Sequence, residues 1–253
     1  MNAFRSLGTT GLQVSRIGLG TVKFGRNTAV KYPTAFDLPD DSALQTLIGV
    51  ARDCNINLID TAPAYGTSET RLGKLLRGQR HEWIIATKVG EYFEDNTSTF
   101  DFSPDATRAS VEASLRRLNT DFLDIVLVHS DGNDEAIIRH SGALETLSRL
   151  KSVGTIRAFG ISTKTLAGAR LALDLCDVIM VAYSAADTSH AEVLELAAAR
   201  QKGVLVKKAL DSGHVTDPLA SLRFVLGHHA VSSAIVGTIN PDHLRANAAA
   251  VNE

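Results

Sequence analysis

The sequence has few cysteines, no long apolar run and no strongly charged segment. Its two cysteines, Cys54 and Cys176, lie far apart in apolar settings, and neither has a metal-ligand neighbour. This usage is typical of reduced thiols in a reducing compartment, not of a disulfide framework. No apolar run approaches the ~18 residues that a membrane helix needs, and residues 1–7 lack the pattern of a signal peptide. We therefore expect a cytoplasmic protein that neither enters a membrane nor holds a metal.

Charge is nearly balanced along the chain. The formal net charge is −2, and no basic run is longer than the pair Arg116–Arg117. A nucleic-acid groove or an anionic membrane surface would require a basic patch, so the composition favours a small molecule as the partner. With 253 residues, 44% of them hydrophobic, the chain can bury a large core and has the length of one α/β barrel. We expect one domain over residues 1–253 and leave the oligomeric state open.

Short apolar runs alternate with helical patterns along most of the chain. Eight runs rich in Val and Ile are typical of buried parallel strands: 17–21, 58–61, 83–88, 125–129, 156–161, 178–181, 204–207 and 234–236. Apolar residues at helical spacing occupy 43–51, 69–76, 104–118, 144–150, 166–173, 190–199, 218–226 and 241–249. Before the first run, polar residues 8–11 can close a hairpin between 4–7 and 12–14. The pattern predicts an α/β fold, the (β/α)8 TIM barrel, with a short N-terminal β-hairpin.

An open doubly wound sheet alternates strands and helices in the same way. Its first strand is usually followed by a Gly-rich phosphate loop, but here Gly18-Leu19-Gly20 leads into Thr-Val-Lys-Phe without a third glycine in register. The barrel is therefore favoured. Two long connections, 22–40 and 89–103, follow the first and third strands, on the face where barrel enzymes place their sites.

Three ionisable residues stand at the carboxyl ends of consecutive predicted strands: Asp60, Lys88 and His129. Such groups cost free energy at these positions unless they are paired or used. Tyr65 follows Asp60 by five residues, so all four should meet at one mouth of the barrel. Lys88 would lower the pKa of the Tyr65 hydroxyl, which is ordinarily about 10. Asp60 would balance Lys88, and His129 would orient a carbonyl oxygen.

Each of these residues also has an ordinary structural explanation. Asp60 can cap its turn, Lys88 can reach solvent from a strand end, and His129 can be a hydrogen-bonded core histidine. Their joint presence on consecutive strands, with a tyrosine beside them, favours a site for proton transfer.

Several motifs resemble those of the aldo-keto reductases. Leu58-Ile-Asp-Thr-Ala-Pro-Ala-Tyr-Gly66 resembles the family signature, and further matches are Ser68-Glu69, Ala86-Thr-Lys88, Ser114-Leu-Arg-Arg-Leu118, Gly154-Thr-Ile-Arg157 and Gly160-Ile-Ser162. The resemblance covers about residues 5–247. It implies reduction of an aldehyde or ketone by hydride transfer from a reduced nicotinamide. In the family's scheme, Tyr65 gives the proton, Lys88 lowers its pKa, Asp60 holds Lys88 and His129 orients the carbonyl.

The resemblance also implies where the cofactor binds. Ser162 matches a serine that holds the nicotinamide carboxamide, whereas Thr163 and Met180 replace the asparagine and glutamine of the family pattern. His243 stands where members that prefer NADP usually place an arginine; the ordinary alternative for this segment is a helix capped by Asn240. We expect NADP(H) more than NAD(H). The expected contacts are Gly20, Thr21, Ser162, Thr163, Met180, Lys207, Gly237, Thr238, Asn240, His243 and Asn247.

Two other interpretations remain open at this point. The altered carboxamide contacts are compatible with a non-catalytic, nicotinamide-binding regulatory protein, and Lys88 can be read as the Schiff-base amine of a barrel lyase or isomerase. The chain also ends soon after its last predicted helix, where many family members carry a loop that shapes the substrate pocket. The aromatic residues of connections 22–40 and 89–103 can line the pocket instead, or they can pack the two loops onto the barrel: Phe24, Tyr32, Phe36, Tyr92, Phe93, Phe100 and Phe102. The natural substrate and the physiological direction are not predicted.

Overall fold

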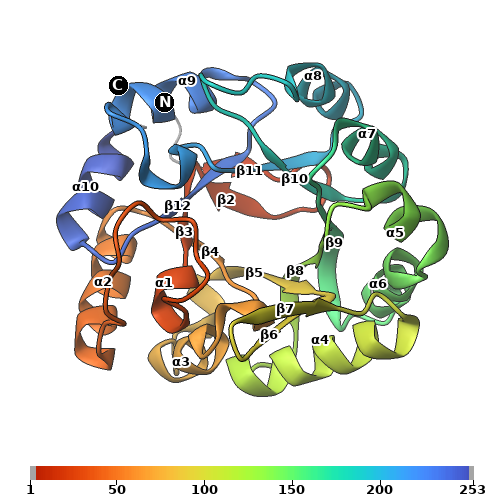
Figure 1. The fold of residues 1–253 in the computed structure, drawn as a ribbon, viewed down its shortest axis with the longest axis horizontal. Helices are drawn as coiled ribbons and strands as arrows, with labels where there is room; N and C mark the ends of the chain where they lie inside the picture. Colours follow the sequence, from red (N-terminus) through yellow and green to blue (C-terminus); the bar gives the residue numbers. More distant parts are fainter. Residues whose placement is uncertain (1–3, 251–253) are drawn as a thin grey trace.

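The centre of the molecule is a closed barrel of parallel strands. The computed structural model describes residues 4–250, and the strand order around the barrel follows the chain, with the last strand pairing back onto the first (Figure 1). The barrel strands are β3 (Ile17–Gly20), β4 (Leu58–Asp60), β5 (Ile84–Val89), β8 (Leu123–His129), β9 (Ile156–Ser162), β10 (Val178–Ala182), β11 (Gly203–Lys207) and β12 (Ser233–Gly237). The predicted (β/α)8 barrel is confirmed.

Helices surround the barrel and cover the outer faces of its strands (Figure 1). The main ones are α2 (Asp41–Asp53), α3 (Ser68–Leu75), α4 (Pro104–Leu118), α6 (Ala143–Ser152), α7 (Leu166–Leu175), α8 (Ala191–Ala199), α9 (Pro218–Gly227) and α10 (Pro241–Ala249). The starts of α4, α9 and α10 carry proline in the first turn after a capping Ser103, Asp217 or Asn240, which satisfies amide groups that the helix leaves free. None of the helices between residues 4 and 250 is long and apolar enough to cross a bilayer.

Two apolar layers hold the fold together. One lies between the strands and the helices, and the other fills the barrel interior. The predicted N-terminal hairpin, β1 (Phe4–Ser6) and β2 (Gln13–Ser15), is confirmed, and its buried Leu7, Leu12 and Val14 join the interior cluster. The hairpin closes the barrel at the end away from the carboxyl ends of the strands, so those carboxyl ends remain for the site.

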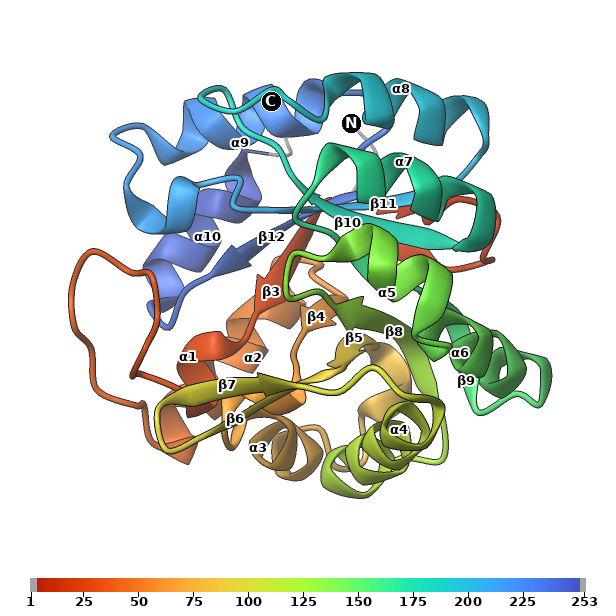
Figure 2. The same ribbon diagram turned by 45° about the vertical axis from the view of Figure 1, so that its right-hand side comes forward.

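The connection 89–103 contains regular structure that the sequence analysis did not predict. Residues Glu91–Glu94 (β6) and Thr97–Phe100 (β7) form an antiparallel hairpin. Asp95 and Asn96, at its turn, both have positive φ angles, of 48° and 60°, as a two-residue hairpin turn requires. Figure 2 shows the hairpin beside α1 (Val22–Gly25), at the mouth of the barrel. Other short elements not predicted are α5 (Asp134–His140) and the 3-10 turns η1 (Pro63–Tyr65), η2 (Arg80–Glu82) and η3 (Asp211–Gly213).

Candidate active site

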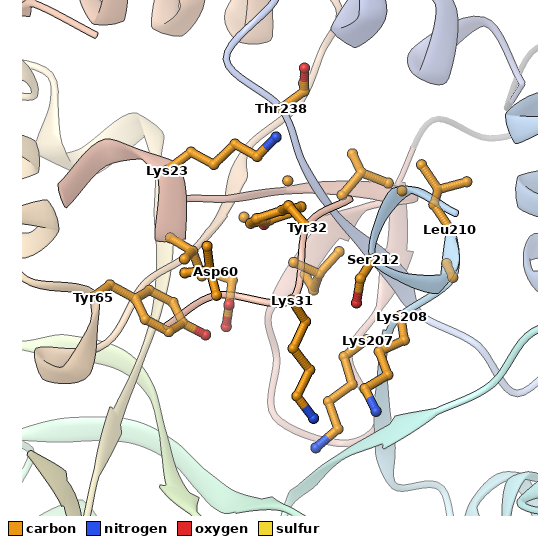
Figure 3. Close-up of a pocket in the computed structure, with 18 of the residues that line it drawn as sticks. Lys23, Lys31, Tyr32, Asp60, Tyr65, Lys207, Lys208, Leu210, Ser212 and Thr238 are labelled. Carbon is orange, nitrogen blue, oxygen red and sulfur yellow. The ribbon is translucent and has the colours of Figure 1, made fainter. Parts of the chain in front are cut away.

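A cavity of about 820 Å³ opens at the carboxyl ends of the barrel strands. All four predicted catalytic residues line it. So do most of the predicted cofactor contacts: Gly20, Ser162, Met180, Lys207, Gly237, Thr238, His243 and Asn247. Figure 3 shows the Tyr65 hydroxyl and the Asp60 carboxylate turned toward the same part of this cavity. The topology therefore brings together residues that lie up to 227 positions apart in the chain, from Gly20 to Asn247.

Lys88 and Asp60 form a buried ion pair at the base of the cavity. Lys88 Nζ lies 2.7 Å from Asp60 Oδ1 and donates a second hydrogen bond to the Thr61 carbonyl at 2.8 Å. The two side chains are only 2% and 6% exposed. Ionised groups are tolerated at such depth when they are paired and hydrogen-bonded, so the two residues depend on each other. An ammonium held in this way is not a nucleophilic amine, which argues against a Schiff base at Lys88.

Tyr65 ends η1, and its ring lies against the ion pair. Lys88 Nζ is 4.7 Å from the ring centroid. Burial raises the pKa of Tyr65 well above its ordinary value, the Asp60 carboxylate raises it further, and Arg26 opposes the shift. The direction differs from the expectation that Lys88 lowers this pKa. The physical reason is that Asp60 offsets the charge of Lys88, which leaves burial as the dominant effect. Tyr65 is therefore a neutral phenol that keeps its proton at neutral pH.

His129, at the end of β8, meets a carboxylate that the sequence analysis missed. Its Nδ1 atom lies 2.6 Å from Glu91 Oε2, and its ring contacts the Tyr65 ring edge-on, with the centroids 6.1 Å apart. Burial lowers the pKa of His129, Glu91 raises it, and Lys88 and Lys207 lower it. Burial would raise the pKa of Glu91, but the contacts with His129 and Ser98 outweigh it and bring that pKa to about 2. The sequence did contain a signal for the hairpin that carries Glu91, because the residue pair Asp95-Asn96 is suited to a hairpin turn.

Lys207 lies on the opposite wall from this hairpin. Its Nζ donates to Ser162 Oγ at 2.8 Å and to the Thr163 carbonyl at 2.7 Å. Burial lowers the pKa of Lys207 to about 7, and repulsion from Lys208 and Lys88 adds to the shift. Close to it, Thr163 Oγ1 is buried without a hydrogen-bond partner among residues 4–250. This hydroxyl is enclosed by the protein, because Thr163 is 1% exposed and does not line the cavity.

Three predicted cofactor contacts do not line the cavity: Thr21, Thr163 and Asn240. The Thr21 hydroxyl already has hydrogen-bond partners within the protein: it donates to the Asp60 carbonyl at 2.9 Å and accepts from Ser68 Oγ at 2.8 Å. The Asn240 side chain caps α10 by accepting from the amides of Asp242 and His243, as in the ordinary structural alternative. These two side chains shape the site without facing it.

The expectation that aromatic residues of the two long connections line the pocket holds for Tyr32. Tyr32 lies on the cavity wall, with Lys23 Nζ 4.0 Å from its ring centroid, and Figure 3 shows it near the middle of the cavity. An added Cβ at Gly237 would lie 2.7 Å from its hydroxyl oxygen. Phe24 instead packs in the core, and Tyr92 and Phe100 are exposed on the hairpin. The aromatic residues thus divide between the two alternatives, because composition alone does not tell which side of a loop faces a cavity.

Comparisons with known proteins agree with this geometry. The model of the aldo/keto reductase family matches residues 16–220. The NADH-specific methylglyoxal reductase of Escherichia coli (strain K12) is 33% identical over 227 residues, which cover 83% of this chain and 68% of that protein. The L-galactose dehydrogenase of Arabidopsis thaliana is 30% identical over 294 residues, which cover 98% of this chain and 88% of that protein.

Solved structures show the same relationship. A protein of Pseudomonas aeruginosa described as an aldo-keto reductase is 52% identical, with a TM-score of 0.91, and the match covers 98% of this chain and 93% of that one. An aldo-keto reductase of Bacillus halodurans in its holo form is 27% identical, with a TM-score of 0.84, over 100% of this chain and 92% of that one. The chain belongs to the aldo/keto reductase family and is an NAD(P)-dependent oxidoreductase that acts on carbonyl or hydroxyl groups.

Proposed function

We propose that this protein reduces a small aldehyde or ketone to an alcohol and that Tyr65 is the proton donor. The observation that carries the proposal is the arrangement of a neutral, partly buried Tyr65 against the Lys88–Asp60 pair, at the wall of a cavity large enough for a ligand. A general acid must hold its proton until the substrate oxygen becomes basic. The raised pKa of Tyr65 meets that requirement.

The bound reduced nicotinamide supplies the hydride. As the carbonyl oxygen gains negative charge, the Tyr65 hydroxyl donates a hydrogen bond and then its proton to that oxygen. The phenolate that remains lies 4.7 Å, measured to the ring centroid, from Lys88 Nζ, whose positive charge stabilises it. Asp60 holds Lys88 in place through the 2.7 Å contact. Each member of the group thus has one task.

The residues present fit a nicotinamide cofactor. Ser162 Oγ at the cavity wall is suited to an amide, and Lys207 adds a donor beside it. Gly20 and Gly237 leave the opposite wall without side chains. Ser162 and Lys207 thus offer hydrogen bonds near Met180, whose sulfur is only a weak acceptor.

The adenosine end of the cofactor would approach the start of α10, where His243 and Asn247 line the cavity. The preference for NADPH stays a prediction, and two features of this helix weaken it. Asp242 adds negative charge in the first turn, and Arg245 Nη1 lies 3.3 Å from the Asp242 carboxylate, which engages the nearest arginine. We propose that NADH binds in the same cleft with comparable affinity; the Escherichia coli relative is named as specific for NADH.

The proposed substrate is a small carbonyl compound, because the nicotinamide end of the cofactor must share the cavity of about 820 Å³ with it. The Escherichia coli relative is named for methylglyoxal, a small aldehyde. We also propose that the chain is one barrel domain working in the reducing cytoplasm, where the free thiols of Cys54 and Cys176 would persist.

The test is to titrate the purified protein with NADPH and NADH, following nicotinamide fluorescence, and then to assay aldehydes and ketones of increasing size. Micromolar binding with turnover of small aldehydes is expected. Binding without turnover of any carbonyl would favour the regulatory interpretation instead, and no binding of either dinucleotide would contradict the proposal.

A further inference from the structure

Glu91 stands beside the reaction site. It opens β6, three residues after Lys88, and its two carboxylate oxygens have different partners. Oε2 lies 2.6 Å from His129 Nδ1, and Oε1 accepts a 2.6 Å hydrogen bond from Ser98 Oγ on β7. The Glu91 side chain is 12% exposed. The hairpin therefore holds a carboxylate in a fixed orientation against the imidazole.

This contact bears on which nitrogen of His129 carries a proton. Nδ1 and the carboxylate oxygen are 2.6 Å apart but are not aligned as a hydrogen bond, because Nδ1 has no hydrogen-bond partner among residues 4–250. The pKa of Glu91 is about 2, so the group is ionised in the physiological range, and an ionised carboxylate only accepts hydrogen bonds. Its negative charge favours a proton on the facing Nδ1 atom. In a neutral imidazole with its proton on Nδ1, the Nε2 atom has a lone pair and accepts hydrogen bonds.

The other nitrogen, Nε2, lies across the ring from Glu91 and is the one left for the cavity that His129 lines. A carbonyl oxygen needs a donor there. A neutral His129 of this tautomer would present a lone pair to the oxygen, whereas the imidazolium would present an N–H group with a positive charge.

We propose that Glu91 is a positioning residue that fixes a proton on His129 Nδ1, so that His129 donates to the substrate carbonyl from Nε2 only as an imidazolium. This inference rests on the proposed function of the cavity. It predicts that carbonyl reduction weakens as the pH rises through the pKa of His129.

The charges around His129 set the pH at which its imidazolium loses a proton. Glu91 on β6 favours the imidazolium, while Lys88 on β5, Lys207 on β11 and the burial of the ring oppose it. Tyr65 of η1 contacts the ring edge-on and is neutral. Arg26, which lowers the pKa of Glu91, keeps that carboxylate ionised. Glu91 is thus the group that favours the imidazolium, and the three opposing influences together leave the pKa of His129 below its ordinary value.

The alternative is that Glu91 only attaches the hairpin to the barrel. A purely mechanical role would affect stability, but it would leave the tautomer and the pKa of His129 unchanged when the carboxylate is replaced by an amide of the same shape. The two roles can therefore be separated by a measurement on the ring itself.

The experiment is ¹⁵N NMR of the histidine side chains across pH, with His129→Gln used to assign the signal. In the unmodified protein the neutral ring should show a protonated Nδ1 and a lone pair on Nε2. Glu91→Gln should lower the pKa of His129 by about one unit, a tenfold change in proton affinity. Glu94→Gln, the same change at an exposed position of the same strand, should leave it unaltered.

Activity supplies the second readout. Between the two pKa values, reduction by Glu91→Gln should fall about tenfold relative to the unmodified protein, with NAD(P)H affinity unchanged. A neutral His129 protonated on Nε2, or an identical pKa in Glu91→Gln, would overturn the proposal. The NMR measurement needs no turnover, and reading the tautomer needs only His129→Gln for the assignment, not Glu91→Gln. It therefore tests the inference even if the protein reduces no carbonyl or Glu91→Gln fails to fold.

Discussion

Replacing the Asp60 carboxylate by an amide should lower the free energy of unfolding, and a second substitution, at Lys88, should restore most of it. Asp60→Asn keeps the size of the side chain but leaves the Lys88 ammonium without a counter-charge at a position where it is 2% exposed. Breaking a buried pair from one side costs about 3–5 kcal/mol of unfolding free energy. The double variant Asp60→Asn/Lys88→Met removes both charges and should recover most of that loss, since an apolar replacement of a buried pair is often neutral.

Urea denaturation of the four proteins of this cycle measures the effect and yields the coupling energy between the two residues. Asp105→Asn is the control, because Asp105 pairs with Arg108 at the surface and is 95% exposed, where an ion pair contributes little. Carbonyl reduction should be lost in both the single and the double variant. A double variant as unstable as Asp60→Asn, or an Asp60→Asn protein no less stable than the Asp105→Asn control, would refute the reasoning.

Two further predictions concern the cofactor side of the cavity. The pKa of Lys207 is about 7 in the folded protein, below its ordinary value, so the unfolded chain binds more protons above pH 7 and Lys207 makes stability rise with pH between about 7 and 10. Lys207→Met should flatten that rise in denaturation curves, and an unchanged slope would contradict the burial of this amine. Asp242→Asn should improve the affinity for NADPH relative to NADH by about two- to fivefold, because it removes an anion from the first turn of α10 and releases Arg245. Fluorescence titrations at low and high salt check this, and an equal gain for both dinucleotides would count against a phosphate site there.

Much of the barrel could be predicted because its strands are buried on both faces. Runs such as 125–129 and 204–207 are almost entirely apolar, and this leaves few alternatives to a central parallel strand. The polar residues that end such runs stood out for the same reason. Asp60, Lys88 and His129 were located by the topology rule that adjacent parallel strands end at one edge.

The features of the site that were not predicted depend on contacts between distant residues, which a strand pattern does not reveal. Glu91 lies in a half-exposed hairpin whose alternation is short, and nothing local shows that it faces His129, 38 residues later. The contact of Lys207 with Ser162 joins two strands that are not neighbours in the barrel. The pKa of Tyr65 was misjudged because the sequence shows a nearby lysine but not the degree of burial, which is the larger effect here.

The central claim is that Tyr65 gives the proton, and Tyr65→Phe tests it most directly. The variant keeps the ring against Lys88 but lacks the hydroxyl, so carbonyl reduction should fall by a factor on the order of 10²–10⁴, while NAD(P)H binding is retained. Tyr92→Phe, at an exposed position of the hairpin, is the matched control and should keep full activity. Loss of reduction in Tyr65→Phe alone, with binding intact, is the predicted result; full reduction by Tyr65→Phe would contradict the account.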